Sequence, residues 1–165
     1  MILKTKVAYF GIFTTVALIF SYIESLIPVP IGIPGIKLGL ANLVIVVALY
    51  KMSVREAGLL SVLRIVLSGF MFANMFSILY SLSGGLLSLL MMSMLKKTNK
   101  FSVIGISISG GVFHNIGQLI MASLVLESFS LTYYLPVLLI SGLVTGFIIG
   151  IVSNEMLKRM KKIEL

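Results

Sequence analysis

Residues 131–159 read LTYYLPVLLISGLVTGFIIGIVSNEMLKR, and this stretch decides the fold class. Its apolar part, 131–157, is long enough to cross a bilayer, because a transmembrane helix needs about 20 apolar residues. It ends in the basic pair Lys158 and Arg159. Five more apolar stretches precede it, at 7–27, 38–50, 57–72, 74–95 and 101–126. We therefore expect an all-α, polytopic membrane protein that forms a bundle of six transmembrane helices.

The composition of the chain supports the same class. Its 165 residues are 59% hydrophobic and only 11% charged, and the mean hydropathy is +1.15. A soluble domain of this size could not cover so much apolar surface with so few charges. Since six spans use most of the chain, we expect a single integral membrane domain over residues 1–165, with no soluble catalytic or nucleotide-binding lobe.

The basic residues lie almost entirely in alternate gaps between the apolar stretches. Lys4 and Lys6 precede the first stretch, Lys51 and Arg55 separate the second from the third, and the remaining basic gaps follow the fourth and the sixth. All the basic residues except Lys37 and Arg64 fall on one side if both termini are cytoplasmic, as the positive-inside rule requires. This pattern predicts a multi-pass protein of the bacterial cytoplasmic membrane, N-in and C-in. It also accounts for the net charge of +8 without nucleic acid as a partner.

The sequences of two connections between the apolar stretches predict their local structure. The first, 28–35, is apolar, but its three prolines remove backbone donors and prevent a helix from continuing. We expect it to lie at the membrane surface or to fold back over the bundle. The second contains Ser53 and Glu56 at the spacing of a capping box, which predicts a helix that begins there.

Small residues recur at the four-residue spacing that allows close helix packing in lipid. The sixth and fifth stretches contain such residues: Gly142, Gly146 and Gly150, Gly105 with Ser109, and Ser107 with Gly111. Internal packing of the bundle is one interpretation. The other is docking of a partner's transmembrane helix, for which the first stretch offers Ala8, Gly11 and Thr15.

Several polar residues lie where cytoplasmic anchoring does not require them. With both termini cytoplasmic, they fall in the outer half or near the middle of the bundle: Glu24, Lys37, Asn42, Arg64, Asn74, His114 and Gln118. An arginine inside the bilayer costs roughly 2.5 to 3.5 kcal/mol and must face a partner or a wet cavity. Either Arg64 forms an ion pair with Glu24, or it lines an outward-facing anion pocket together with Lys37.

His114 and Gln118 are four residues apart and therefore share a helix face, whereas Asn115 points about 100° away from His114. An amide on the same face makes a pocket as plausible as a packed interior, and we include all three residues in the candidate substrate-binding set. One histidine without cysteine or aspartate offers too few ligands for a metal site. We expect neither a metal nor a cofactor.

The residue types argue against an enzyme. The sequence has no phosphate-binding loop of the G-x-x-x-x-G-K type, and without aspartate it has no Ser–His–Asp set. A prenyl diphosphate synthase needs aspartate-rich motifs to hold magnesium on diphosphate, and this chain cannot supply them. We therefore expect no catalytic residues.

Five motifs follow one another along the chain: YIESLIP at 22–28, KLGLAN at 37–42, SGGLLS at 83–88, HNIGQ at 114–118 and YYLP at 133–136. Together they resemble the bacterial Gx transporter family, also labelled heptaprenyl diphosphate synthase component I. That family is similar to the S-components of energy-coupling-factor transporters, which implies six helices and a ligand pocket near the outer face. The resemblance also implies a partner, either an energising module with transmembrane and ATPase subunits or an electron-transfer membrane complex.

Two functions remain open at this point. The first is a membrane substrate-binding and transport subunit that takes up a small anionic organic molecule, an isoprenoid, flavin or quinone-like compound, from the outer face. The second is a non-transporting membrane subunit that anchors or assembles an extracellular electron-transfer complex or an isoprenoid- or quinone-handling complex. Both place the protein in the lipid bilayer, and neither involves nucleic acid.

The charge pattern makes a topology prediction. Single cysteines at Val29 and Ser128 should react with an impermeant thiol reagent in intact cells, whereas a cysteine at Asn99 should react only after the membrane is opened. The chain contains no native cysteine, so the background is clean. Labelling of the Asn99 site in intact cells would contradict the N-in, C-in topology.

Overall fold

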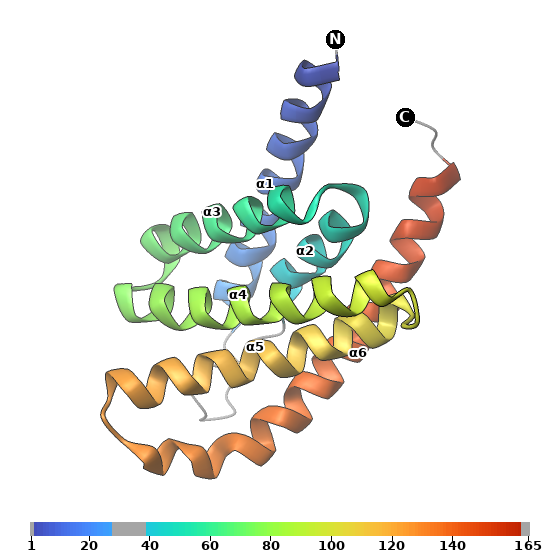
Figure 1. Ribbon diagram of the computed structural model, residues 1–165. Coiled ribbons are helices and arrows are strands. Elements are labelled where there is room, and N and C mark those ends of the chain that lie inside the picture. Colours follow the sequence, from blue (N-terminus) through green and yellow to red (C-terminus); the bar gives the residue numbers. More distant parts are fainter. Residues whose placement is uncertain (1, 28–38, 163–165) are drawn as a thin grey trace.

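The computed structural model describes residues 2–27 and 39–162 of the chain. Within this part the elements are six α-helices and one short 3-10 helix (Figure 1): α1 Ile2–Leu26, α2 Leu40–Lys51, α3 Val54–Phe72, α4 Met75–Thr98, α5 Val103–Val125, η1 Phe129–Tyr134 and α6 Leu135–Lys162. The all-α class and the number of helices are confirmed. The segment 28–35 and Lys37 lie outside the described residues.

Four of the helical segments are long and apolar enough to cross a membrane: Lys6–Leu26, Met75–Thr98, Val103–Val125 and Phe129–Met160. The chain is thus a multi-pass membrane protein by length and composition. The 12 residues of α2 give about 18 Å of helix, which is less than the roughly 30 Å of a bilayer core. Helix α3 carries Arg55, Glu56 and Arg64 within its 19 residues. That α2 and α3 also cross the bilayer stays a prediction.

The helix boundaries follow the expected ones with one notable change. The last helix begins at Leu135 instead of residue 131, because the preceding residues form η1, and Pro136 then occupies the first turn of α6, where proline is tolerated. The capping box of α3 is confirmed. Ser53 Oγ accepts from the Glu56 backbone at 3.2 Å, and the Ser53 backbone donates to Glu56 Oε2 at 2.8 Å. These bonds, with Lys6 nearby, lower the pKa of Glu56.

Helix α2 is the core of the bundle. Its residues 41 and 43–49 are all buried, and it contacts α1, α3 and α6. At its carboxyl end, Lys96 Nζ donates to the Leu49 carbonyl and lies 4.9 Å from the centre of the Tyr50 ring. A cation at this position offsets the partial negative charge of the helix end.

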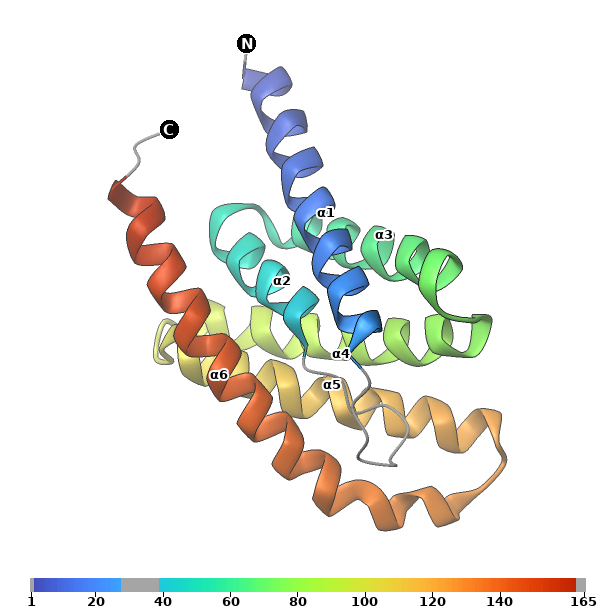
Figure 2. The same ribbon diagram turned by 180° about the vertical axis from the view of Figure 1, so that it is seen from behind.

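The carboxyl ends of three helices meet on one side of the molecule. Lys96 of α4 contacts α2, and Lys51 Nζ of α2 donates to the Met160 carbonyl of α6 at 3.3 Å. In Figures 1 and 2 the α2–α3 and α4–α5 turns lie on one side of the bundle, and the α3–α4 turn lies on the other. The described basic residues other than Arg64 belong to helix ends and turns on the first side: Lys6, Lys51, Arg55, Lys96, Lys97, Lys100, Lys158 and Arg159. The orientation of this side toward the cytoplasm stays a prediction.

The glycines of α6 pack directly against the backbone of α5, so the internal-packing interpretation is confirmed for them. A Cβ added to Gly146 would lie 2.7 Å from Ile108 Cα, and one added to Gly150 would lie 2.8 Å from Ile104 Cα. At Gly142 the nearest atom would be the Gly111 carbonyl oxygen at 2.8 Å. Any side chain at these positions forces the two helices apart.

Adding one carbon at this contact should therefore destabilise the protein. We expect Gly146→Ala to lower the free energy of unfolding by roughly 1 to 3 kcal/mol, the usual cost of overpacking. Gly11→Ala is the matched control, because nothing lies within 4 Å of the added carbon and alanine favours a helix by about 1 kcal/mol over glycine. Thermal unfolding in detergent, followed by circular dichroism, measures both. Equal stability of the two variants would contradict the close packing.

Candidate functional site

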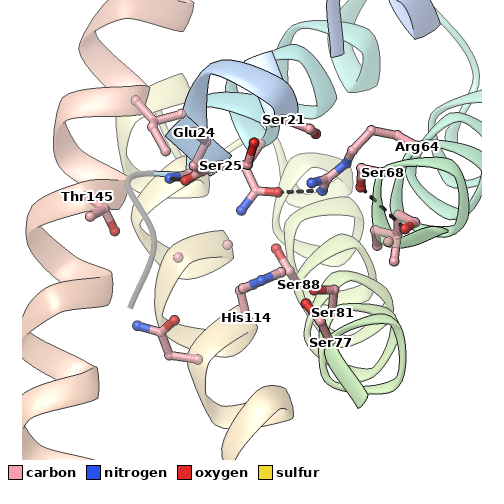
Figure 3. Close-up of a pocket in the computed structure, with 18 of the residues that line it drawn as sticks. Ser21, Glu24, Ser25, Arg64, Ser68, Ser77, Ser81, Ser88, His114 and Thr145 are labelled. Carbon is pink, nitrogen blue, oxygen red and sulfur yellow. Dashed lines mark hydrogen bonds between the residues drawn. The ribbon is translucent and has the colours of Figure 1, made fainter. Parts of the chain in front are cut away.

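A cavity of about 410 Å³ lies inside the bundle, with residues from all six α-helices in its wall (Figure 3). Fourteen of its 26 described lining residues have polar side chains. Apolar walls are the rule for ligand pockets, with only a few polar groups that orient the ligand. A wall this polar, inside a membrane protein, is therefore the first candidate for a functional site.

The end of α1 and the start of α2 form one part of the wall. Glu24 Oε1 of α1 accepts a hydrogen bond from the backbone N–H of Gly39, the residue before α2. Gly39 has φ of 75°, a left-handed conformation that glycine adopts without strain. A Cβ there would also lie 2.9 Å from Ile149 Cδ1 of α6. The carboxylate thus anchors the start of α2 against α1.

Arg64 of α3 lies beside this anchor and is only 9% exposed. Its Nη2 donates to Asn42 Oδ1 of α2 at 2.9 Å (Figure 3). Its Nε is buried and has no hydrogen-bond acceptor in the described part of the chain. The guanidinium group has five N–H donors, so most of its hydrogen-bonding capacity is available to the cavity.

The direct ion pair between Arg64 and Glu24, one of the two alternatives from the sequence, is not present. Both residues are described, and no nitrogen of Arg64 lies within 4.0 Å of a Glu24 carboxylate oxygen. A salt bridge that does form joins Glu155 and Arg159, one helical turn apart on the surface of α6. The Glu24 carboxylate is occupied by Gly39 instead, and Arg64 by Asn42.

Helices α4 and α5 supply a second polar wall. Ser77, Ser81 and Ser88 of α4 are spaced by four and seven residues and therefore share one helix face. Ser107 and His114 of α5 also line the cavity. Sequence reasoning missed the serines, although the spacing of those on α4 was a readable signal for a polar stripe.

Six of the eight residues proposed from the sequence line this one cavity: Glu24, Asn42, Arg64, Asn74, His114 and Asn115. Lys37 lies outside the described residues. Gln118 is buried but does not line the cavity. The reason is the close approach of α4 and α5: a Cβ at Gly84 would lie 2.9 Å from Gln118 Cγ, so α4 covers the amide.

Two of the six residues are already engaged in the fold. Asn74 is the N-cap of α4, and its Oδ1 accepts from the Ser77 backbone at 2.9 Å. Asn115 Nδ2 donates to the Leu138 carbonyl at 2.7 Å and to Ser141 Oγ at 3.1 Å, and so joins α5 to α6. Their amides position helices at the wall of the cavity more than they offer free groups to it.

The cavity can therefore hold an oxyanion by hydrogen bonds. Arg64 supplies positive charge, and the first backbone N–H groups of α2, which has no side-chain cap, carry the positive end of the helix dipole. Among the described residues, no group of three or more carboxylates and histidines is arranged to hold a metal ion. The chemistry of the described wall is that of binding by charge and hydrogen bonds.

These features define a helical, multi-pass membrane protein with a polar cavity inside its bundle. The family model described as heptaprenyl diphosphate synthase component I matches residues 13–156, and the chain belongs to that family. This confirms the family that the motifs indicated. No curated protein and no solved structure matches the chain.

The role of Glu24 as the anchor of α2 can be tested by two substitutions. We expect Glu24→Gln to keep its stability, because an amide oxygen can accept the same hydrogen bond from Gly39. Glu24→Leu removes the acceptor and should cost roughly 1 to 3 kcal/mol in the free energy of unfolding. If both variants lose stability equally, the negative charge of Glu24 acts on Arg64 and the anchor interpretation is wrong.

Proposed function

We propose that the protein is a substrate-binding and transport subunit of the bacterial cytoplasmic membrane, similar to an S-component, which takes up a small anionic molecule from the outer face. One observation carries this proposal. A buried arginine lines the cavity, and in the described chain its hydrogen-bond partner is the neutral Asn42 and not a carboxylate.

A ligand is supported because Arg64 makes no direct ion pair with any described residue, and the Glu24 carboxylate, whose charge acts on it through space, is hydrogen-bonded to Gly39. An uncompensated charge inside a bilayer is costly, and such residues mark ion or substrate paths. A carboxylate or phosphate can accept two parallel hydrogen bonds from a guanidinium group, which is the strongest pairing open to Arg64. Transporters also bind anionic substrate groups at the N-terminus of a helix that begins within the membrane.

The position of the cavity in the bundle supports entry of the substrate from the outer face. Ala73 and Asn74, which are exposed in the α3–α4 turn, belong to the cavity wall. This turn lies opposite the side that carries the basic helix ends (Figure 1). If that basic side is cytoplasmic, as the charge pattern predicts, the cavity is reached from outside.

Binding without catalysis fits the chain better than the synthase in the family's description. The sequence contains no aspartate, and the described residues of the cavity wall include one carboxylate, that of Glu24. Prenyl transfer needs several carboxylates to hold magnesium on diphosphate. The proposal therefore assigns no enzymatic activity to this chain and no metal or cofactor to its cavity.

A second function, that of an anchor or assembly subunit, is favoured by a different observation. Ala8, Gly11 and Thr15 lie on an exposed face of α1, and nothing lies within 4 Å of a Cβ added to Gly11. Such a face can accept a partner's transmembrane helix, whether from an energising module or from an electron-transfer complex. Purification separates the two functions: a transporter retains a small molecule, and an anchor retains a fixed protein partner and an empty cavity.

The anion-binding proposal predicts the effect of removing the charge. Arg64→Leu should lower the affinity for the molecule that co-purifies with the wild type by tenfold or more, because one charge-assisted hydrogen bond contributes roughly 1.5 to 3 kcal/mol. Mass spectrometry identifies the retained molecule, and titration of the stripped protein measures the affinity.

Arg55→Leu is the matched control, because Arg55 lies on the same helix but is exposed at its first turn. It should bind as the wild type does. Unchanged binding by Arg64→Leu would contradict the proposal. An Arg64→Leu protein that unfolds, and that Glu24→Gln rescues, would show a structural role for the arginine instead.

A further inference from the structure

The hydroxyl groups around the cavity fall into two sets that differ in what they can still bind. On the α1, α3 and α6 side, Ser21, Ser25, Ser68 and Thr145 donate their hydroxyl hydrogens to carbonyls of their own helices. These groups can then act only as acceptors. They give the ligand little beyond a polar surface.

The second set lies on the α4 and α5 side. It comprises Ser77, Ser81 and Ser88 on one face of α4, together with Ser107 of α5, which also lines the cavity. In the part of the chain that the structure describes, none of these four hydroxyls makes a hydrogen bond. Ser88 and Ser107 are only 5% and 3% exposed, so what accessibility they have is toward the cavity. We call these four residues the serine wall.

The serine wall and the arginine occupy different parts of the cavity. In Figure 3, Ser77, Ser81 and Ser88 follow one another along α4, Arg64 reaches the cavity from α3 nearest to Ser88, and Glu24 lies on the opposite side of the view. A ligand that reaches both must therefore have an acidic group at one end and groups that hydrogen-bond at the other. Apolar atoms against the serine wall would leave buried hydroxyls without partners, which is unfavourable.

The size of the cavity limits the ligand further. Its volume is about 410 Å³. It lies near the lower end of the range of about 300 to 1,000 Å³ for small-molecule sites. This volume favours a compact molecule over a long prenyl chain. Phe72 is the single Phe, Tyr or Trp in the described wall, so stacking surfaces for a large aromatic ring system are few.

We infer that the ligand is a compact hydroxylated oxyanion, with its acidic group at Arg64 and the start of α2 and its hydroxyl groups at the serine wall. This inference rests on the proposed function and narrows its substrate class from isoprenoid, flavin or quinone-like anions to polar ones. A sugar acid and a sugar phosphate share the required chemistry. They differ only in whether a carboxylate or a phosphate meets the guanidinium group.

Four probes added to the purified full-length protein in detergent test the inference. Gluconate and ribose 5-phosphate are hydroxylated oxyanions, inorganic phosphate is an oxyanion without a hydroxylated body, and farnesyl diphosphate is an oxyanion with an apolar body. Binding is measured as the concentration dependence of the unfolding temperature, since a ligand of the folded state raises it. We expect gluconate or ribose 5-phosphate to bind at least tenfold more tightly than inorganic phosphate and farnesyl diphosphate. Whichever of these two probes binds more tightly shows whether the acidic group of the ligand is a carboxylate or a phosphate.

A double variant, Ser81→Ala with Ser88→Ala, then tests the serine wall itself. Each lost hydrogen bond to a neutral group should lower the affinity for the hydroxylated probe roughly threefold to tenfold. The affinity for inorganic phosphate should stay unchanged, which shows that the fold is intact. Ser93→Ala is the control, because Ser93 is buried on the same helix, donates to the Leu90 carbonyl and does not line the cavity. It should leave every affinity unchanged.

The outcomes separate this inference from the proposed function. Preferential binding of farnesyl diphosphate that depends on Arg64 would overturn the hydroxylated ligand and leave the anion-binding proposal in place. A double serine variant with unchanged affinity for the hydroxylated probe would overturn the serine wall. Binding of none of the four probes overturns the inference, and if no small molecule co-purifies either, the proposed function fails with it.

Discussion

The short length of α2 is the constraint on which the rest of this structure depends. Its 12 residues form about 18 Å of helix, while its neighbours α1 and α4 have 25 and 24 residues. One end of α2 is held by Glu24 through Gly39, and the other by Lys96 through Leu49. A buried helix that begins part of the way through the bundle brings its uncapped N–H groups to the wall of an interior cavity.

Close backbone contacts decide which side chains reach that cavity. Glycines bring α6 onto α5 and α4 onto α5 until backbone atoms touch. In lipid, where apolar side chains gain little by leaving the solvent, such van der Waals contact is what holds helices together. The same contact that covers Gln118 at Gly84 turns the serine face of α4 inward. The same small residues therefore determine both the close packing of the helices and which side chains line the cavity.

The family is described as a component of a synthase, whereas the residues of this chain favour binding of a ligand. Membership in the heptaprenyl diphosphate synthase component I family is shown by a match over residues 13–156. Yet the described cavity wall offers one arginine, one carboxylate and many hydroxyls and amides, and the chain has no aspartate. These groups favour the anion-binding function that we propose, and the chain lacks the aspartate-rich motifs that hold magnesium on diphosphate. The function of this chain is therefore better argued from its site than from the description of its family.

The sequence by itself determined the membrane class, the six helices, the capping box at Ser53 and Glu56 and the importance of Arg64, because hydropathy, capping and the cost of charge in lipid act locally along the chain. Of the eight site residues that it proposed, six line the cavity. Only the tertiary structure decided that Arg64 meets Asn42 and not Glu24, that Gln118 is covered and that the serines converge. Those outcomes depend on the rotation and separation of neighbouring helices. Hydropathy does not encode either quantity, since every face of a helix in lipid can be apolar.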